Sequence, residues 1–92
     1  MQNWYLYIIR CRDGSLYTGV ATHVERRFTE HAAQGNRCAK YLRGKAPLKL
    51  VFKRKIGTRG RALAFEYKVK QLSKSGKELL ILGRLKGFWP LR

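Results

Sequence analysis

The chain has 92 residues, which is enough for one small domain with a modest hydrophobic core. It carries 21 lysines and arginines against 5 acidic residues, and this net charge of +16 favours a polyanionic partner, above all nucleic acid. The sequence shows neither a long apolar run nor a signal peptide, so we expect no membrane partner and a cytoplasmic location.

The first predicted elements are the two strands of a hairpin. An aromatic and β-branched run predicts a strand from Trp4 to Cys11, and the run from Leu16 to Val20 predicts the returning strand. Asp13-Gly14 between them is a strong turn signal. The length of the loop decides the register of the pair, and the register decides which side chains share a face.

Two loop lengths are compatible with this turn, and they place Tyr17 on different faces. A two-residue turn sets Tyr17 opposite Arg10, away from Tyr7. A three-residue loop with Gly14 in the left-handed conformation sets Tyr7 opposite Gly19, and the two tyrosines become diagonal neighbours on one face. We predict the three-residue loop, in which Gly19 would leave a gap where the backbone of a ligand can approach.

The hairpin is followed by a predicted helix. Thr22 and Glu25 have the spacing of a capping box, and the pattern predicts a helix to about Gln34 that Gly35-Asn36 ends. The pattern of apolar residues in the following segments predicts a short helix over 37–42, a third strand over 48–56 and a helix over 58–72. A second capping box, Ser75 with Glu78, opens a last helix through Leu82.

This order of elements predicts a single domain over residues 1–83 and a C-terminal tail over residues 84–92. Cys11 and Cys38 form no CxxC motif, so we expect free thiols and no zinc site.

Three polar residues lie beside apolar stripes, where polar groups need partners. Arg27 and His31 border the stripe of Val24, Phe28 and Ala32 on the first helix. Two interpretations of Arg27 and His31 are open. In the first, Arg27 extends its charge to solvent and His31 is a half-buried core residue; in the second, the two residues bind an anion.

Glu66 is the third, because the other acidic residues serve turns, caps or solvent. Two interpretations account for the Glu66 carboxylate beside the apolar stripe: an ion pair with Lys70, four residues later, or the binding of one divalent cation.

Taken together, these residues resemble the GIY-YIG nuclease superfamily, and most of all its small stand-alone bacterial members. The resemblance extends from Trp4 to Leu82. Tyr5-Leu6-Tyr7 stands where the family has GIY, and Tyr17-Thr18-Gly19 stands where it has YIG. Residues 24–31 look like the helix that carries the arginine of the family, and residues 66–72 like the helix that carries its metal-binding glutamate. Thr18 departs from the motif, which has isoleucine there.

The resemblance implies an α/β (α+β) fold, a small three-stranded antiparallel sheet flanked by helices. It also implies a metal-dependent endonuclease that hydrolyses phosphodiester bonds in DNA, directed by structure or damage in repair or recombination. Glu66 would hold Mg²⁺ or Mn²⁺, Arg27 would grip the phosphate, and Tyr7 or Tyr17 would orient or deprotonate the attacking water. His31 is a rival base, or it positions Tyr17.

The alternative is a catalytically inactive module that binds DNA or RNA; of the two, we expect DNA. The residues expected to contact nucleic acid are Gly19, Arg26, Tyr41, Arg43, Lys45 and Lys70.

Overall fold

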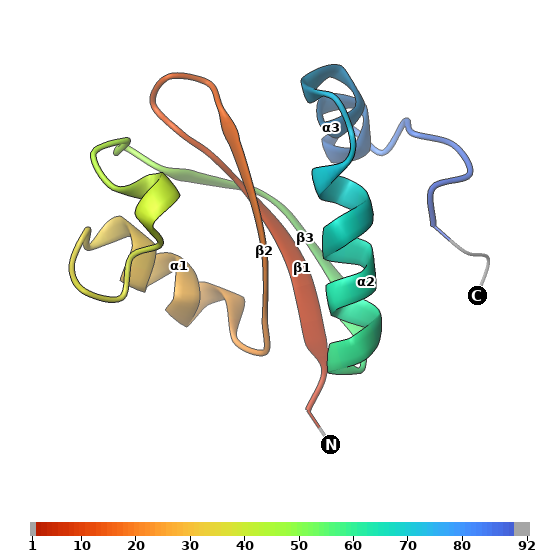
Figure 1. Cartoon of the computed structure of the whole chain (residues 1–92), viewed down its shortest axis with the longest axis horizontal. Coiled ribbons are helices and arrows are strands. Elements are labelled where there is room, and N and C mark those ends of the chain that lie inside the picture. Colours follow the sequence, from red (N-terminus) through yellow and green to blue (C-terminus); the bar gives the residue numbers. More distant parts are fainter. Residues whose placement is uncertain (1, 90–92) are drawn as a thin grey trace.

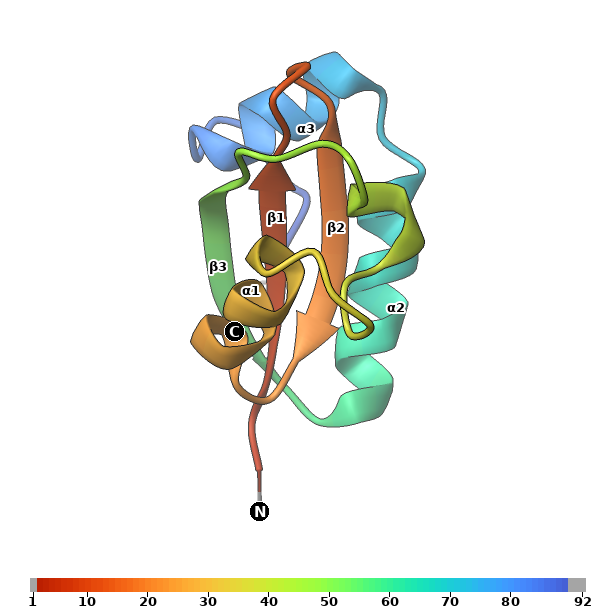
Figure 2. The same cartoon turned by 90° about the vertical axis from the view of Figure 1, so that its left-hand side faces the viewer.

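A three-stranded antiparallel sheet lies between two sets of helices (Figures 1 and 2). The computed structural model describes residues 2–89. The strands β1 (Trp4–Arg10), β2 (Leu16–Ala21) and β3 (Lys49–Gly57) stand in the order β2-β1-β3. The predicted α+β class and its sheet are thus confirmed.

The helices occupy both faces of the sheet. One face carries α1 (Val24–Ala32) and the 3₁₀ turn η1 (Lys40–Leu42), and the other carries α2 (Arg59–Lys70) and α3 (Lys74–Ile81). Within residues 2–89, no helix has the length and apolar character needed to cross a membrane.

The central strand β1 is buried on both of its faces, which divides the core in two. Leu6 and Ile8 belong to the cluster on the α2 side, and Tyr7 and Ile9 belong to the cluster on the α1 side. Burying each of these side chains contributes about 1.5–3 kcal/mol to folding. Tyr7 therefore holds its phenol on a rigid element, with the α1 helix packed over it.

The hairpin between β1 and β2 has the three-residue loop that the sequence predicts. Gly14 adopts a φ of 87°, and the Cys11 amide donates to the Ser15 carbonyl at 2.9 Å. Tyr7 consequently pairs with Gly19 across the two strands. The tyrosine of β2 lies two residues away on the same face, so the register prediction is confirmed.

The start of α1 differs from the prediction. His23 is the N-cap and makes no side-chain cap bond, so the predicted capping box of Thr22 with Glu25 is wrong. Glu25 instead forms an ion pair with Lys53 of β3, with 2.7 Å between nitrogen and oxygen. This pair fixes the first turn of α1 to the sheet. The helix also ends earlier than predicted, at Ala32.

Gln34 ties the segment after α1 back to the helix. It adopts a φ of 59°, and its Nε2 donates to the carbonyls of His31 at 3.0 Å and Leu42 at 3.1 Å. Its Oε1 accepts from the Gly44 amide at 2.8 Å. These bonds hold η1 against α1, and the short helix predicted over residues 37–42 is reduced to η1.

The predicted capping box of Ser75 with Glu78 is also wrong. α3 is capped by Ser73, whose Oγ accepts from the Gly76 amide at 3.1 Å. Glu78 accepts from both terminal nitrogens of Arg10, at 2.7 and 2.8 Å, and so fastens α3 to β1. The hydrogen bonds from Arg10 lower the pKa of Glu78 to about 2.

Glu78→Gln is expected to lower the free energy of unfolding by about 1 kcal/mol at neutral pH, since solvent screens this partly exposed pair. The depressed pKa makes the contribution complete above the ordinary value of 4.5, and it is lost as the pH falls toward about 2. Urea unfolding of both proteins at neutral pH and near pH 2 measures this. A difference of the same size at both pH values would contradict the assignment.

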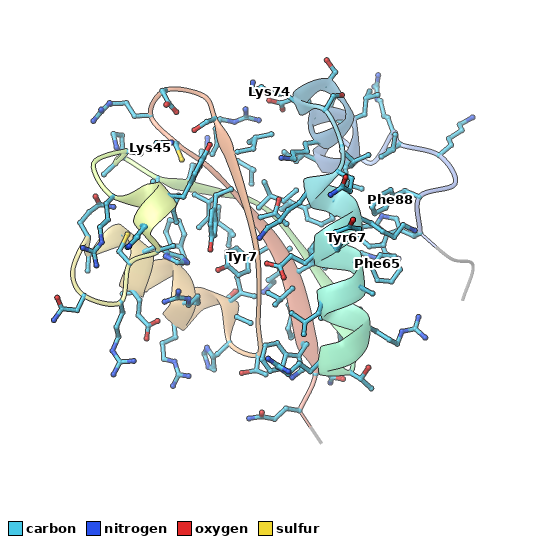
Figure 3. The ribbon with its side chains drawn as sticks, viewed as in Figure 1. Tyr7, Lys45, Phe65, Tyr67, Lys74 and Phe88 are labelled. Atoms are coloured by element: carbon cyan, nitrogen blue, oxygen red, sulfur yellow. The ribbon has the colours of Figure 1, made fainter. Side chains whose placement is uncertain are left out.

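Aromatic residues of the predicted C-terminal tail pack on the domain. Phe88 lies beside Phe65 of α2, with ring centroids 6.3 Å apart (Figure 3). Trp89 stacks on Phe52 of β3 at 6.2 Å with an angle of 3° between the rings. The last residues of the predicted tail, 90–92, lie outside the described residues.

Candidate active site

Tyr7 lies at the centre of the candidate site, and the side chain is only 1% exposed. A Cβ atom on Gly19 would lie 2.5 Å from Tyr7 Oη, so the phenol occupies the space that the glycine leaves. The expected gap at Gly19 is therefore filled by the Tyr7 ring, and a contact of Gly19 with nucleic acid stays a prediction. Gly19 is needed because the Tyr7 ring crosses the neighbouring strand at this point.

Gly19→Ala is expected to destabilise the fold by about 1–3 kcal/mol, because the Tyr7 ring must move out of its place. Gly60→Ala is the matched control. Gly60 lies in α2 with open space around its Cβ position, so alanine there should stabilise the helix by about 0.5–1 kcal/mol. Thermal unfolding compares them, and equal melting temperatures for the two variants would contradict the argument.

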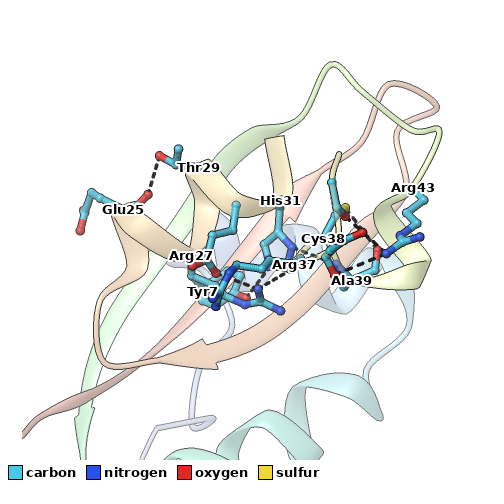
Figure 4. A network of polar contacts seen from close by, with 12 residues as sticks. Tyr7, Glu25, Arg27, Thr29, His31, Arg37, Cys38, Ala39 and Arg43 are labelled. Atoms are coloured by element: carbon cyan, nitrogen blue, oxygen red, sulfur yellow. Dashed lines mark hydrogen bonds and ion pairs between the residues drawn. The ribbon is translucent and has the colours of Figure 1, made fainter. Parts of the chain in front are cut away.

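His31 of α1 is fully buried, whereas Ala32, which the helical pattern placed in the apolar stripe, is exposed. Both ring nitrogens of His31 are hydrogen-bonded (Figure 4). The Ala39 amide donates to Nδ1 at 3.2 Å, and Tyr7 Oη lies 3.0 Å from Nε2. A backbone amide can only donate, so the proton of the neutral ring is on Nε2. His31 thus donates to Tyr7, and the phenol proton is free for another acceptor.

Burial keeps both partners of this bond neutral near physiological pH. Burial, and then the charge of Arg27, lower the pKa of His31 to about 4. Burial raises the pKa of Tyr7 above its ordinary value, and Tyr17 raises it further, while Arg27 opposes the shift. A histidine with both nitrogens occupied has no lone pair for a proton, which argues against His31 as a base. Tyr7 is equipped to donate a hydrogen bond.

Arg27 is held in place by one of its nitrogens. Nη1 donates to Glu30 at 2.9 Å and to the carbonyl of Arg37 at 2.6 Å (Figure 4). Glu30 was expected in solvent, but it is half-buried in this ion pair. The i,i+3 spacing of the two residues is the signal that could have revealed it. The other two guanidinium nitrogens remain available to bind Tyr7 and an anion. Arg27 is close enough to the phenol to oppose the rise in the pKa of Tyr7.

Glu66 reaches the same region from α2, on the opposite side of the sheet. The pKa of Tyr7 is raised first by burial, then by Tyr17, and least by the Glu66 carboxylate. The side chain is 20% exposed and pairs with Lys70 at 3.3 Å. The expected ion pair thus exists, but Lys70 is itself half exposed and can turn away to solvent.

A single hard divalent cation fits this carboxylate. Mg²⁺ commonly takes one or two protein carboxylates and completes its shell with water and substrate oxygens. Within residues 2–89, no three side chains of the metal-binding types gather, and Glu66 is the carboxylate expected to hold such an ion.

Tyr17 joins the group from β2. Its ring centroid lies 6.4 Å from that of Tyr7 and 5.6 Å from that of His31. On its other side Tyr17 stacks with Tyr41 of η1 at 5.8 Å, and Lys45 Nζ lies 3.6 Å from the centre of the Tyr41 ring. Tyr17 is more exposed than Tyr7, so it is the phenol that water can reach.

Two of the residues expected to contact nucleic acid lie at the periphery. Arg26 is exposed on α1 and lines a separate pocket with Glu30 and Arg37. Arg43 is also exposed and donates to the carbonyl of Gly35 at 3.3 Å. Four of the expected catalytic side chains, those of Tyr7, Tyr17, Arg27 and His31, thus lie together, and these two arginines lie on the surface around them.

A mixed sheet-and-helix fold that gathers two phenols, a guanidinium and an imidazole is typical of a phosphate-handling domain. Residues 3–79 match the GIY-YIG catalytic domain, so the chain belongs to the GIY-YIG family, within the nuclease superfamily. Nucleases of this family act on nucleic acid and generally use divalent metals.

Two relatives are small bacterial proteins. The UPF0213 protein of Cronobacter sakazakii is 52% identical over 85 residues, which are 92% of this chain and 87% of the relative. The UPF0213 protein YhbQ of Escherichia coli K12 is 52% identical over 81 residues, which are 88% and 79% of the two chains. Neither name states a reaction.

Two solution NMR structures share the fold. The UPF0213 protein from Bacillus halodurans has a TM-score of 0.58 and 40% identity, covering 95% of this chain and 90% of its own. A protein from E. faecalis has a TM-score of 0.60 and 32% identity, with coverage of 100% and 97%.

Proposed function

We propose that this protein is a metal-dependent endonuclease that hydrolyses phosphodiester bonds in DNA. The observation that carries the proposal is the buried hydrogen bond between Tyr7 and His31, beside a guanidinium of Arg27 that Glu30 and the Arg37 carbonyl hold in place. A structural tyrosine needs a hydrogen-bond partner, but it does not need a pre-oriented guanidinium beside it.

Arg27 binds the phosphate in this mechanism. Glu30 and the Arg37 carbonyl hold Nη1, so the guanidinium is already oriented when the substrate arrives. The remaining nitrogens contact the phosphoryl oxygens and stabilise the charge that grows there in the transition state.

Tyr7 and Tyr17 have different roles in this mechanism. Tyr7 receives a hydrogen bond from His31 and directs its own proton to an oxygen of the substrate. Tyr17, the more exposed phenol, orients the attacking water. Glu66 holds Mg²⁺ or Mn²⁺, which when bound neutralises phosphate charge and stabilises the leaving oxygen.

We assign target choice to the structure or damage of the DNA, in repair or recombination. Lysine and arginine contacts to phosphates position a duplex without reading its sequence. The surface around the site is of this kind, with Arg26, Arg43, Lys45 and Lys70 exposed or half exposed.

The proposal is tested by incubating the protein with branched, flapped, single-stranded and duplex DNA, and with RNA, under Mg²⁺, Mn²⁺ or EDTA. Cleavage of at least one DNA substrate, with a metal requirement, is expected. Salt-sensitive binding without turnover on any substrate would favour the catalytically inactive module instead.

Tyr7→Phe is expected to lower kcat about 10²-fold, because one hydrogen-bond donor is lost from the site. Tyr67→Phe, an exposed tyrosine of α2, should leave kcat unchanged. The pH profile gives a second check. The pKa of His31 is about 4, so its protonation affects the rate only as the pH falls toward that value. An inflection near pH 6.5 that disappears in His31→Gln would make His31 the base after all.

A further inference from the structure

A pocket of about 330 Å³ lies at the outer edge of β2, next to the candidate site. In the ribbon, η1 stands on one side of β2 and α2 on the other (Figure 1). The residues that line the pocket come from all three segments and from α3: Leu16, Tyr17, Thr18, Tyr41, Lys70 and Lys77.

We propose that this pocket binds one unstacked nucleobase of the substrate, beside the phosphate that is cleaved. The proposal rests on the proposed function, because it names the part of the nucleic acid that borders the same site. Thr18 directly precedes Gly19, which faces Tyr7 across the two strands. Tyr17 itself lines the pocket, and its ring centroid lies 6.4 Å from that of Tyr7, so the pocket borders the catalytic group.

Tyr41 gives the pocket an aromatic wall that is already ordered. Its side chain is 45% exposed, yet Tyr17 stacks against it at 5.8 Å with an angle of 26°. Aromatic side chains are the platforms on which single-strand binding proteins stack bases. Lys45 Nζ lies 3.6 Å from the centre of the Tyr41 ring, so a base stacks there when Lys45 swings from the ring to a backbone phosphate.

Thr18 lines the pocket and has a buried hydroxyl without a hydrogen-bond partner among the described residues. The residue is 3% exposed. A buried hydroxyl without a partner is unfavourable, and such groups in native proteins commonly bind a ligand or water. The edge of a nucleobase carries both donors and acceptors, so it can pair with this hydroxyl.

Two lysines complete the opposite wall. Lys77 forms no ion pair with any described residue, so its charge is available to a phosphate. Lys70 pairs with Glu66 and thereby connects the pocket to the proposed metal ligand. The pocket thus combines an aromatic ring, a polar group and cations, which is the chemistry of a nucleotide with its base turned out of the stack.

An unstacked base can come from a single strand or from a base flipped out of a duplex, and the test separates these sources. Binding is measured in EDTA, where no cleavage occurs, by fluorescence anisotropy of labelled oligonucleotides. The four probes are a single strand, an abasic strand of the same length, a perfect duplex and a duplex with one unpaired base.

The wild type is expected to bind the single strand about tenfold more tightly than the abasic strand. Tyr41→Ala should remove this difference, and Thr18→Val should reduce it about threefold. Lys77→Gln should weaken both strands alike, and more than Lys55→Gln, which removes the same charge from the far strand β3. Preference for the duplex with one unpaired base over the perfect duplex identifies base flipping as a source.

Equal affinity of the wild type for the base-bearing and the abasic strand would overturn the pocket assignment. So would a Tyr41→Ala variant that keeps the full difference while folding normally by circular dichroism. Because every measurement is made without metal, these outcomes are independent of whether the protein cleaves DNA. Failure of the proposed function would show as absent turnover, with base-dependent binding intact.

Discussion

Glu66→Gln is expected to lower metal-dependent cleavage by at least about 10³-fold, because the site loses its proposed carboxylate ligand. Glutamine keeps the size of the side chain and removes only its charge. The loss should be accompanied by a loss of Mn²⁺ binding, measured by electron paramagnetic resonance on the free protein. This second readout reports the metal site even where turnover is too slow to measure.

Glu25→Gln is the matched control for this experiment. Glu25 is an exposed carboxylate on α1 that pairs with Lys53, away from the candidate site. We expect its substitution to leave both kcat and Mn²⁺ binding unchanged. If Glu66→Gln cleaved DNA at the rate of the wild type, Glu66 would be only the partner of Lys70, and the metal site would lie elsewhere.

Arg27→Ala is expected to lower kcat by about 10²–10³-fold, with a smaller change in KM. The guanidinium is oriented by Glu30 and the Arg37 carbonyl before substrate binds, so its contacts strengthen mainly in the transition state. Arg27→Lys should recover little of the activity, because an ammonium group cannot bind phosphate through two parallel hydrogen bonds. Steady-state kinetics on the preferred DNA substrate measure these values.

Two further variants test whether the loss of kcat in Arg27→Ala comes from the oriented guanidinium. Arg84→Ala removes the same charge from a residue after α3 and should leave kcat unchanged. Glu30→Gln should lower kcat by an intermediate amount, since Arg27 keeps only the carbonyl of Arg37 as an anchor. A raised KM with unchanged kcat in Arg27→Ala would mean that Arg27 only binds substrate, equally in the ground state and the transition state.

Local patterns were reliable where a turn or a strand depends on neighbouring residues. Gly14 determined the loop of the hairpin, and the loop set the register that places Tyr7 opposite Gly19. Helix starts were less reliable, because Glu25 and Glu78 have the spacing of capping residues but are used in ion pairs with Lys53 and Arg10. Charged partners from distant strands competed with the local caps, and no local pattern contains them.

The sequence by itself determined the class of fold, the hairpin register and the set of five residues that the GIY-YIG resemblance singles out. Only the tertiary structure decided how these residues are used. The Ala39 amide, eight residues after His31, fixes the proton of the ring on Nε2 and makes His31 a donor to Tyr7. The contact between the Ala39 amide and His31 depends on Gln34, whose side chain bonds the carbonyls of His31 and Leu42 and so holds the loop after α1 against the helix. Side-chain spacing along a helix carries no information about such a contact.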